Sequence, residues 1–202
     1  MKKDLFAQKS KQWDLSSRRL QSAKSIANSI ANTIKLTPDM HVMDFGAGTG
    51  LLSYCLSNSL KKITLIDNSP SMLKVFQEKE DEFLCLTEMI NIDLTKESLH
   101  KESIYDGIVS SMTLHHIEDI KRLFQIFYTL LPKNGFIALA DLDTEDGSFH
   151  SNNEGVYHFG FQRDKLKEIA IEVGFKELLF TTSNKINKPH SDFTIFLMTA
   201  RK

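Results

Sequence analysis

The sequence predicts an α/β protein with a doubly wound, Rossmann-like sheet of seven strands. Apolar runs alternate with helix-patterned segments along the 202-residue chain, and the first run ends in a turn with glycines at 46, 48 and 50. The last two apolar runs follow each other without a helix between them. Alternation predicts a parallel sheet covered on both faces. A closing pair of strands is most simply antiparallel. The length suits one domain.

The first half of the chain gives clear signals for the order of its elements. We expect a helix over 4–35, strands over 40–45 and 62–67, and a helix over 51–60 between them. Ser69 and Pro70 suit the N-cap and first position of a further helix. The long first helix is predicted from apolar residues at three- and four-residue steps, namely Leu20, Ala23, Ile26, Ala27, Ile30, Ala31 and Ile34.

In the second half, strands are expected within 83–92 and over 105–111, 136–141, 175–182 and 192–200. Helices are expected over 117–131 and 163–173, the second ending at Gly174. The segment 141–162 has no regular pattern and is long for a strand-to-helix connection. Such segments are often lids or binding loops.

Composition excludes several classes of function. The formal net charge is -1, so no overall basic field attracts nucleic acid or anionic lipid. No apolar run approaches the roughly 18 residues expected of a membrane span. The N-terminus lacks the apolar stretch of a secretory signal. Cys55 and Cys85 are interpreted as buried thiols in a reducing compartment, so we expect a cytoplasmic protein.

The glycine turn, Asp44 to Gly50, indicates a nucleotide-like cofactor. It lacks the lysine of a phosphate loop, and its third glycine comes one position earlier than in the dinucleotide fingerprint. A carboxylate at Asp44 would repel a pyrophosphate but could accept hydrogen bonds from an ammonium group. The pattern therefore favours a nucleoside-like cofactor that carries an ammonium and lacks a pyrophosphate.

Polar residues follow the next strands as well. Asp67 ends the second strand 21 positions after Gly46, where an acid can bind the two hydroxyls of a ribose. Asp93 suits the exocyclic amine of adenine, although an ordinary surface acid explains it equally well. The fourth strand ends in Ser110 and Ser111, and two histidines follow.

Together these motifs resemble the class I S-adenosylmethionine-dependent methyltransferases, especially the small-molecule enzymes of ubiquinone and menaquinone biosynthesis. The resemblance covers about residues 10–200 and rests on segments 42–50, 65–73, 91–94, 105–117 and 130–136. It implies the sheet order 3-2-1-4-5-7-6, with an antiparallel last strand. It also implies S-adenosylmethionine as cofactor and S-adenosylhomocysteine as product.

The resemblance implies a cofactor site and a lid. Asp44 would order the methionyl ammonium, Asp67 the ribose and Asp93 the adenine. Trp13 and Asp14 resemble a pair in an N-terminal helix that covers the cofactor, so we divide the chain into a helical cap, 1–36, and a methyltransferase domain, 37–202. The full set of expected cofactor residues is Asp44, Gly46, Ala47, Gly48, Thr49, Gly50, Asp67, Asn68, Met72, Asp93, Leu94, Ser110 and Ser111.

Methyl transfer is an in-line displacement, and a hydroxyl or acidic carbon acceptor also needs a base. The candidate bases are His150, His158 and His115. His115 and its neighbour His116 also suit a place in the cofactor shell. Aromatic residues and histidines make 141–162 the favoured acceptor site. A solvated loop and a metal site with Asp141, Asp143 or Glu154 are the alternatives, and no metal is assigned.

The sequence also limits the acceptor. The motif typical of amino methylation on adenine is absent, because Ser110-Ser111-Met112-Thr113 occupies its position. No basic, aromatic-rich appendage suits nucleic acid. We therefore predict a small-molecule acceptor, with oxygen or carbon favoured. The alternatives are a nicotinamide-dependent oxidoreductase and a non-catalytic regulatory protein that binds S-adenosylmethionine. Neither the pathway nor the oligomeric state can be predicted.

Overall fold

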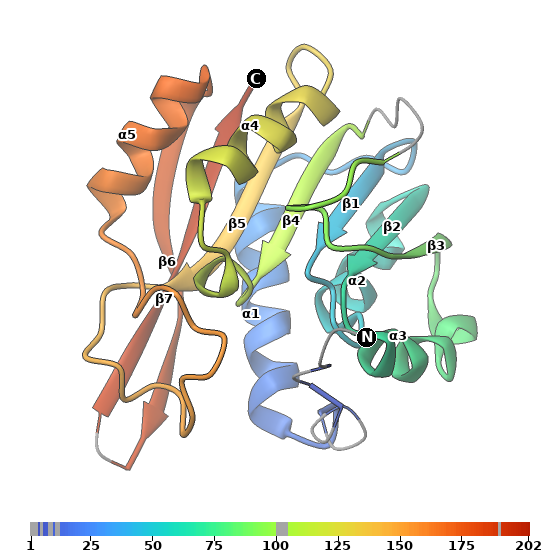
Figure 1. Ribbon diagram of the computed structural model, residues 1–202. Coiled ribbons are helices and arrows are strands. Elements are labelled where there is room, and N and C mark those ends of the chain that lie inside the picture. The colour runs from blue at the N-terminus through green and yellow to red at the C-terminus, as the bar shows by residue number, and fades with distance from the viewer. Residues whose placement is uncertain (1–3, 5, 8–9, 11–12, 100–104, 190) are drawn as a thin grey trace.

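The computed structural model describes residues 4, 6–7, 10, 13–99, 105–189 and 191–202 (Figure 1). One sheet of seven strands has the order β3-β2-β1-β4-β5-β7-β6. The strands are β1 His41–Phe45, β2 Lys62–Asp67, β3 Leu86–Asn91, β4 Gly107–Ser111, β5 Phe136–Leu142, β6 Lys176–Lys188 and β7 Ser191–Arg201. β1 to β5 run parallel, and β7 is antiparallel to β5 and β6. The predicted fold class and strand order are confirmed.

Helices cover both faces of this sheet. They are α1 Ser17–Thr33, α2 Leu51–Leu56, α3 Pro70–Gln77, α4 Ile120–Leu130 and α5 Arg163–Val173, with short 3₁₀ turns η2 Ser57–Ser59, η3 Glu80–Glu82 and η4 Leu114–His116. Figure 1 shows α4 and α5 in front of the sheet and α1 behind it. Adjacent strand residues point to opposite faces: Met43 packs in the core with α4 and α5, and Val42 packs in the core with α1, α2 and α3.

The predicted helix over 4–35 is wrong in its first part. α1 begins at Ser17, and described residues before it form turns. The apolar stripe begins only at Leu20, and Leu15 is 81% exposed, so no apolar face before Leu20 supports a helix. Asp4 accepts hydrogen bonds from the side chains of Ser69 and Ser71 instead.

Other boundaries also differ from the prediction. The helix predicted over 51–60 ends at Leu56 and is followed by the 3₁₀ turn η2. α4 begins at Ile120 rather than 117, because the Asp119 side chain accepts a hydrogen bond from the backbone N–H of Arg122 and caps the helix there. β6 is 13 residues long and continues to Lys188, well beyond 182. Its polar second half stays in register with β7 after a shift between Thr182 and Asn184, so the strand pair projects beyond the rest of the sheet.

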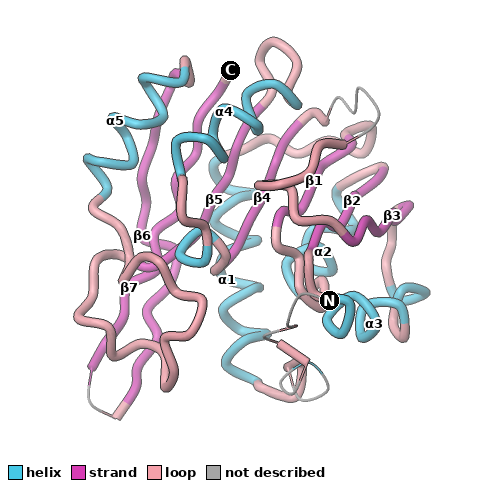
Figure 2. The backbone as a smooth tube through the Cα atoms, viewed as in Figure 1, coloured by secondary structure: helices cyan, strands magenta, loops and turns pink. Residues whose placement is uncertain are grey.

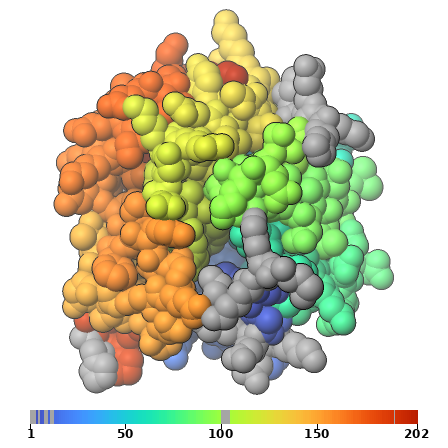
Figure 3. All heavy atoms as spheres, viewed as in Figure 1, coloured from blue at the N-terminus to red at the C-terminus, as the bar shows by residue number. Residues whose placement is uncertain are grey.

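The expected irregular segment is confirmed. Residues 143–162 have no helix or strand, apart from a single bridge between Asp143 and Phe161. Figure 2 shows this segment as a loop that follows the carboxyl end of β5 and lies beside β6. Figure 3 shows the orange surface of this loop on the same face of the molecule as the dark blue N-terminal atoms. The C-terminus lies at the opposite edge. Within the described ranges, none of the helices has the length and apolar character that crossing a bilayer requires.

Candidate functional site

The glycine turn leaves open space at the end of β1. Gly46 and Gly48 have φ of +67° and +57°, which glycine adopts without steric cost. A Cβ atom at Gly46 would lie 2.2 Å from Cγ2 of Thr113, whereas one at Gly48 would meet nothing within 4 Å. Gly46 is therefore required for packing, and Gly48 borders space that a ligand can enter.

Asp44 is a buried carboxylate beneath this turn. It is 1% exposed, and the Ser53 hydroxyl donates to its Oδ2 at 2.6 Å. Burial and, to a lesser extent, the nearby charge of Asp67 together raise the pKa of Asp44 to about 7. No cationic side chain in the described part of the chain pairs with it. A buried acid of this kind fits the ammonium group of the expected cofactor.

Asp67 ties the end of β2 to the glycine turn. Its Oδ2 accepts the backbone N–H of Gly48 at 2.7 Å, and its Oδ1 accepts that of Ser69 at 2.8 Å. Burial raises the pKa of the Asp67 carboxyl. Each oxygen keeps a second lone pair, which suits the two hydroxyls of a ribose. Asn68 beside it is exposed, and Met72 is buried in α3.

The remaining expected cofactor residues follow β3 and β4. Asp93 accepts from Thr95 Oγ1 at 2.6 Å and pairs with Lys96 at 3.0 Å, so its charge is already compensated locally. Leu94 is buried in the core. Ser110 donates to the Phe45 carbonyl at 2.7 Å and joins β4 to β1. Ser111 is the half-buried last residue of β4.

The described N-terminal residues contact the ends of three strands. Asp14 accepts the Thr49 hydroxyl at 2.6 Å, after β1, and also pairs with Lys79. Asp4 binds Ser69, after β2. These contacts bring residues far apart in sequence over one edge of the sheet.

Aromatic contacts continue this cover toward β4. The Phe6 ring lies 5.9 Å from the Trp13 ring and 5.6 Å from the His116 ring, edge-on to both. The Arg19 guanidinium lies over the Trp13 ring at 3.9 Å. The arrangement matches a lid, although Trp13 contacts neighbours of its own segment rather than the glycine turn.

Three histidines meet beside the end of β5. The ring centroids of His115 and His116 are 4.3 Å apart, those of His115 and His150 are 4.9 Å apart, and those of His116 and His150 are 5.8 Å apart. His115 Nδ1 lies 2.7 Å from Oδ1 of Asp141, and both side chains are buried. His116 Nδ1 lies 2.6 Å from the Gly155 carbonyl oxygen. Loop 143–162 thus closes over this cluster.

Two ring nitrogens of the cluster stay unused. Among the described residues, neither His115 Nε2 nor His150 Nε2 has a hydrogen-bond partner, and both atoms are buried. Burial and, to a lesser extent, the nearby His115 and His116 together lower the pKa of His150 to about 4. His150 is therefore neutral at physiological pH. Buried polar atoms without partners are uncommon and mark the place where a substrate group can bind.

His158, the third candidate base, lies apart from the cluster. Its Nε2 is 2.8 Å from the Ile117 carbonyl oxygen, and its ring is 5.0 Å from that of Phe161. The alternative metal ligands are also separated, since Asp143 forms a two-point ion pair with Arg163 at 2.7 Å. Across the described ranges, no three His, Cys, Asp or Glu side chains are placed to hold a metal ion.

Sequence reasoning missed Asp141 as the partner of His115. It considered Asp141 only as a metal ligand. The two residues are 26 positions apart, and no local pattern joins them. One available signal was an acid inside the apolar run of β5, where Asp141 is fully buried, because a buried carboxylate needs a partner.

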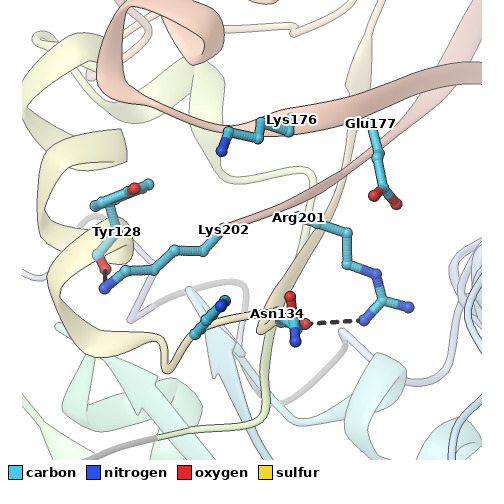
Figure 4. Close-up of a pocket in the computed structure, with 7 residues that line it drawn as sticks. Tyr128, Asn134, Lys176, Glu177, Arg201 and Lys202 are labelled. Carbon is cyan, nitrogen blue, oxygen red and sulfur yellow. Dashed lines mark hydrogen bonds between the residues drawn. The ribbon is translucent and has the colours of Figure 1, made fainter.

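Two surface cavities are prominent, and neither contains the glycine turn. One, of about 500 Å³, lies at the opposite edge of the sheet near the C-terminus (Figure 4). The other, of about 440 Å³, lies between α1 and β6.

This sheet order, with the glycine turn after β1 and acids within β1, at the end of β2 and after β3, defines a class I S-adenosylmethionine-dependent methyltransferase. The family model described as "Methyltransferase domain" matches residues 18–178. The chain therefore belongs to the methyltransferase domain family, whose cofactor is S-adenosylmethionine.

Curated relatives match parts of the chain. It is 34% identical over 120 residues to an uncharacterized methyltransferase of Schizosaccharomyces pombe, a match covering 56% of this chain and 42% of that protein. It is 32% identical over 102 residues to malonyl-[acyl-carrier protein] O-methyltransferase 1 of Ilyobacter polytropus, covering 50% and 37%. The matches thus span less than half the length of these relatives.

Solved structures share the fold at low identity. Phosphoethanolamine N-methyltransferase 2 of Haemonchus contortus, in complex with S-adenosyl-L-methionine, superposes with a TM-score of 0.70 and 14% identity, covering 98% of this chain and 59% of that one. The [4+2]-cyclase SpnF superposes with a TM-score of 0.72 and 15% identity, covering 90% and 81%. The fold is shared by proteins with different reactions, so the acceptor must be argued from the site.

Proposed function

We propose that the protein transfers a methyl group from S-adenosylmethionine to a small-molecule acceptor, with oxygen or carbon as the acceptor atom. The observation that carries this proposal is the buried Asp141–His115 pair beside the carboxyl edge, with its outer nitrogen unpartnered. The O-methyltransferase name of one relative agrees with an oxygen acceptor. Structural likeness to an N-methyltransferase makes nitrogen the alternative.

The cofactor would be held by the turn after β1 and the acid after β2. Asp44 would compensate the ammonium, directly or through water, and Asp67 would bind the ribose. Gly48 would let the cofactor approach the backbone, since a side chain there would project into that space. Asp93 would have to exchange its contact with Thr95 or Lys96 for the adenine amine.

When bound, the cofactor supplies an activated sulfonium methyl group, so the protein mainly orients the acceptor and excludes water. Asp141 accepts the proton on Nδ1 of His115 and leaves Nε2 as the basic atom. That nitrogen would take the proton from the acceptor's hydroxyl or acidic carbon, the acceptor oxygen or carbon would bond to the methyl group, and the methyl–sulfur bond would break to leave S-adenosylhomocysteine. His150 remains neutral and adds a second polar atom beside the acceptor.

The lid and the location of the protein are part of the same proposal. Residues 1–36 would act as a cap, with Asp14 holding the lid to Thr49. A small-molecule acceptor and a cytoplasmic location agree with the near-zero net charge. Nucleic acid is a poor candidate because the chain has no overall basic field.

The test begins with the cofactor. Isothermal titration should detect binding of S-adenosylhomocysteine and no binding of NAD. The protein is then assayed with a panel of alcohols, carboxylic acids, acidic carbon compounds and amines. It should release S-adenosylhomocysteine with at least one oxygen or carbon acceptor of this panel. NAD binding would favour an oxidoreductase. Cofactor binding without turnover across the panel would favour a regulatory protein.

A further inference from the structure

A cationic groove lies at the β6 edge of the sheet. It lies between the first half of α1 and the end of β6, with a volume of about 440 Å³. β6 runs parallel to β5, because both are antiparallel to β7. The end of β6 is therefore at the carboxyl edge, which Figure 1 places beside the start of α1 and loop 143–162. The lining residues are Arg18, Gln21, Lys24, Ser25, Asn28, Asn184, Lys185, Ile186 and Asn187.

The chemistry of this lining selects for anions. Arg18, Lys24 and Lys185 are exposed cations, and the lining contains no carboxylate. None of their three charged side-chain groups has an ion pair or hydrogen bond with any described residue. The amides and hydroxyl of the other lining residues add neutral donors. The whole chain has a net charge of -1, so this positive surface is a local feature.

Two carboxylates lie near the groove, although they are not part of its lining. Asp192 accepts the Asn187 amide at 2.6 Å, and Glu145 acts electrostatically on Lys188. Glu145 is also engaged by the backbone N–H groups of Gly147 and Phe149. Hydrogen bonds from these neutral donors leave both carboxylates charged, but no ion pair between described residues joins either of them to Arg18, Lys24 or Lys185.

The walls of the groove are joined by a direct contact. Asn184 donates from its side-chain amide to the Ser22 hydroxyl at 3.1 Å and links β6 to α1. A register shift between Thr182 and Asn184 bends the strand at this point. The groove is therefore preformed by packed elements, which lowers the ordering cost of binding.

Lys188 connects the groove to the histidine cluster. Burial lowers the pKa of Lys188, and the charge of Arg18 lowers it further. Its Nζ donates to the Phe149 carbonyl and lies 4.0 Å from the centre of the Phe149 ring. That ring is 4.8 Å from the ring of His150. Arg18 thus acts electrostatically on Lys188, and contacts lead from Lys188 through Phe149 to His150.

We propose that this groove binds the anionic group, a phosphate or a carboxylate, of the methyl acceptor, whose reacting end lies at His115 and His150. The inference rests on the proposed function and narrows its acceptor to an anionic molecule. The cavity at the other edge also has cations (Figure 4), but Lys202 there donates to the carbonyls of Tyr128 and Leu131 at the end of α4. It lies at the amino ends of the parallel strands and cannot serve this reaction.

Binding of a simple anion tests the groove without any turnover. Isothermal titration of inorganic pyrophosphate and of tricarballylate is compared for the wild type, a Lys24→Glu/Lys185→Glu double variant and a Lys167→Glu control. Lys167 is exposed on α5, away from the groove. We expect at least one anion to bind the wild type and the control, and to bind the double variant at least tenfold more weakly. Equal binding to the double variant would overturn the proposal.

The two anions also distinguish which anionic group the acceptor carries. Preference for pyrophosphate indicates a phosphorylated acceptor, and preference for tricarballylate indicates a carboxylated one. S-adenosylhomocysteine affinity serves as the folding control and should be equal in all three proteins.

Kinetics then test the role of the bound anion. Each phosphorylated or carboxylated acceptor of a panel is paired with its neutral analogue. The double variant should raise KM for the anionic member at least tenfold and leave kcat unchanged. An unchanged KM, or equal use of the neutral analogue, would refute the assignment to the acceptor. Anion binding in the groove without turnover of any panel member would instead contradict the proposed function and leave the anion site in place.

Discussion

The Nδ1 atom of His115 lies 2.7 Å from the Oδ1 atom of Asp141, and both side chains are almost completely buried. The carboxylate is itself fixed, because its Oδ1 accepts the Leu142 N–H at 2.7 Å and its Oδ2 accepts the His115 N–H at 3.3 Å. A carboxylate facing Nδ1 favours the tautomer with its proton there. The lone pair of the outer nitrogen, Nε2, then has no hydrogen-bond partner among the described residues.

Replacing Asp141 by Asn should slow methyl transfer without weakening cofactor binding. An amide can donate to Nδ1 and favour the opposite tautomer, which removes the basic lone pair from Nε2. Because a positioned base contributes about 10²–10⁴-fold, we expect kcat to fall at least about 100-fold. The pH profile should also lose the limb that reports this base. Release of S-adenosylhomocysteine measures the rate, and titration measures cofactor affinity.

The matched control for Asp141→Asn is His158→Gln. The His158 ring contacts the Ile117 carbonyl and lies outside the cluster. We expect this variant to keep kcat within about threefold of the wild type, a range typical of a change without a role in proton transfer. A large loss of kcat in His158→Gln, with full activity in Asp141→Asn, would assign the base to His158 instead.

His150 should make the protein sensitive to acid. Its pKa is lowered to about 4 by burial and by the neighbouring histidines, below the unfolded value of about 6.5. The unfolded chain therefore binds more protons between these values, and the free energy of unfolding falls as the pH decreases from about 6.5 to 4. His150→Gln should flatten this part of the curve in urea unfolding at pH 5 and pH 7. Parallel curves for the two proteins would contradict the assignment.

In the ligand-free protein, Asp44 should have the opposite effect to His150 on how the free energy of unfolding changes with pH. Burial raises its pKa to about 7, above the unfolded value of about 3.9. The folded protein holds the extra proton, so its contribution to the free energy of unfolding falls as the pH rises from about 4 to about 7. Asp44→Asn should remove this dependence and gain, relative to wild type, on the order of 3 kcal/mol between pH 4 and pH 8.

The same variant should lose cofactor affinity. An ammonium group stabilises the ionised carboxylate, so binding of S-adenosylhomocysteine to the wild type should strengthen from pH 6 to pH 8. In Asp44→Asn the affinity should be weaker and nearly independent of pH. Calorimetry at both pH values measures this, and an unchanged affinity in the variant would show that Asp44 does not face the ammonium.

The features near the cofactor could be predicted because their signals are local. The end of β1, the positive φ of Gly46 and Gly48, and the N-cap at Ser69 each follow from a few adjacent residues. The order of strands and helices then brings the strand ends to one edge. For the same reason Asp44 and Asp67 could be placed there from sequence.

Features held by distant contacts could not be predicted. The second half of β6 is polar and resembles a loop in sequence, but it pairs with β7, whose Phe193 and Ile195 are buried. The turns before α1 depend on Asp4 and its contacts with Ser69 and Ser71, 65 and 67 positions away. The cationic groove is likewise made by α1 and β6, elements separated by most of the chain.

Alanine substitutions at Gly46 and Gly48 should distinguish a glycine required for folding from one required for cofactor binding. Both positions have positive φ, so each alanine costs about 1–2 kcal/mol in backbone strain. At Gly46 the new Cβ also overlaps the Thr113 side chain, so Gly46→Ala should lose more stability in urea unfolding. At Gly48 it meets open space, and Gly48→Ala should fold with only the strain cost yet bind S-adenosylhomocysteine at least tenfold more weakly. Gly147→Ala, with φ of +87° in the loop, is the control for strain, although its Cβ would also lie 3.2 Å from the Phe159 ring; it should bind S-adenosylhomocysteine normally. Wild-type affinity in Gly48→Ala would show that the cofactor does not pass over this turn.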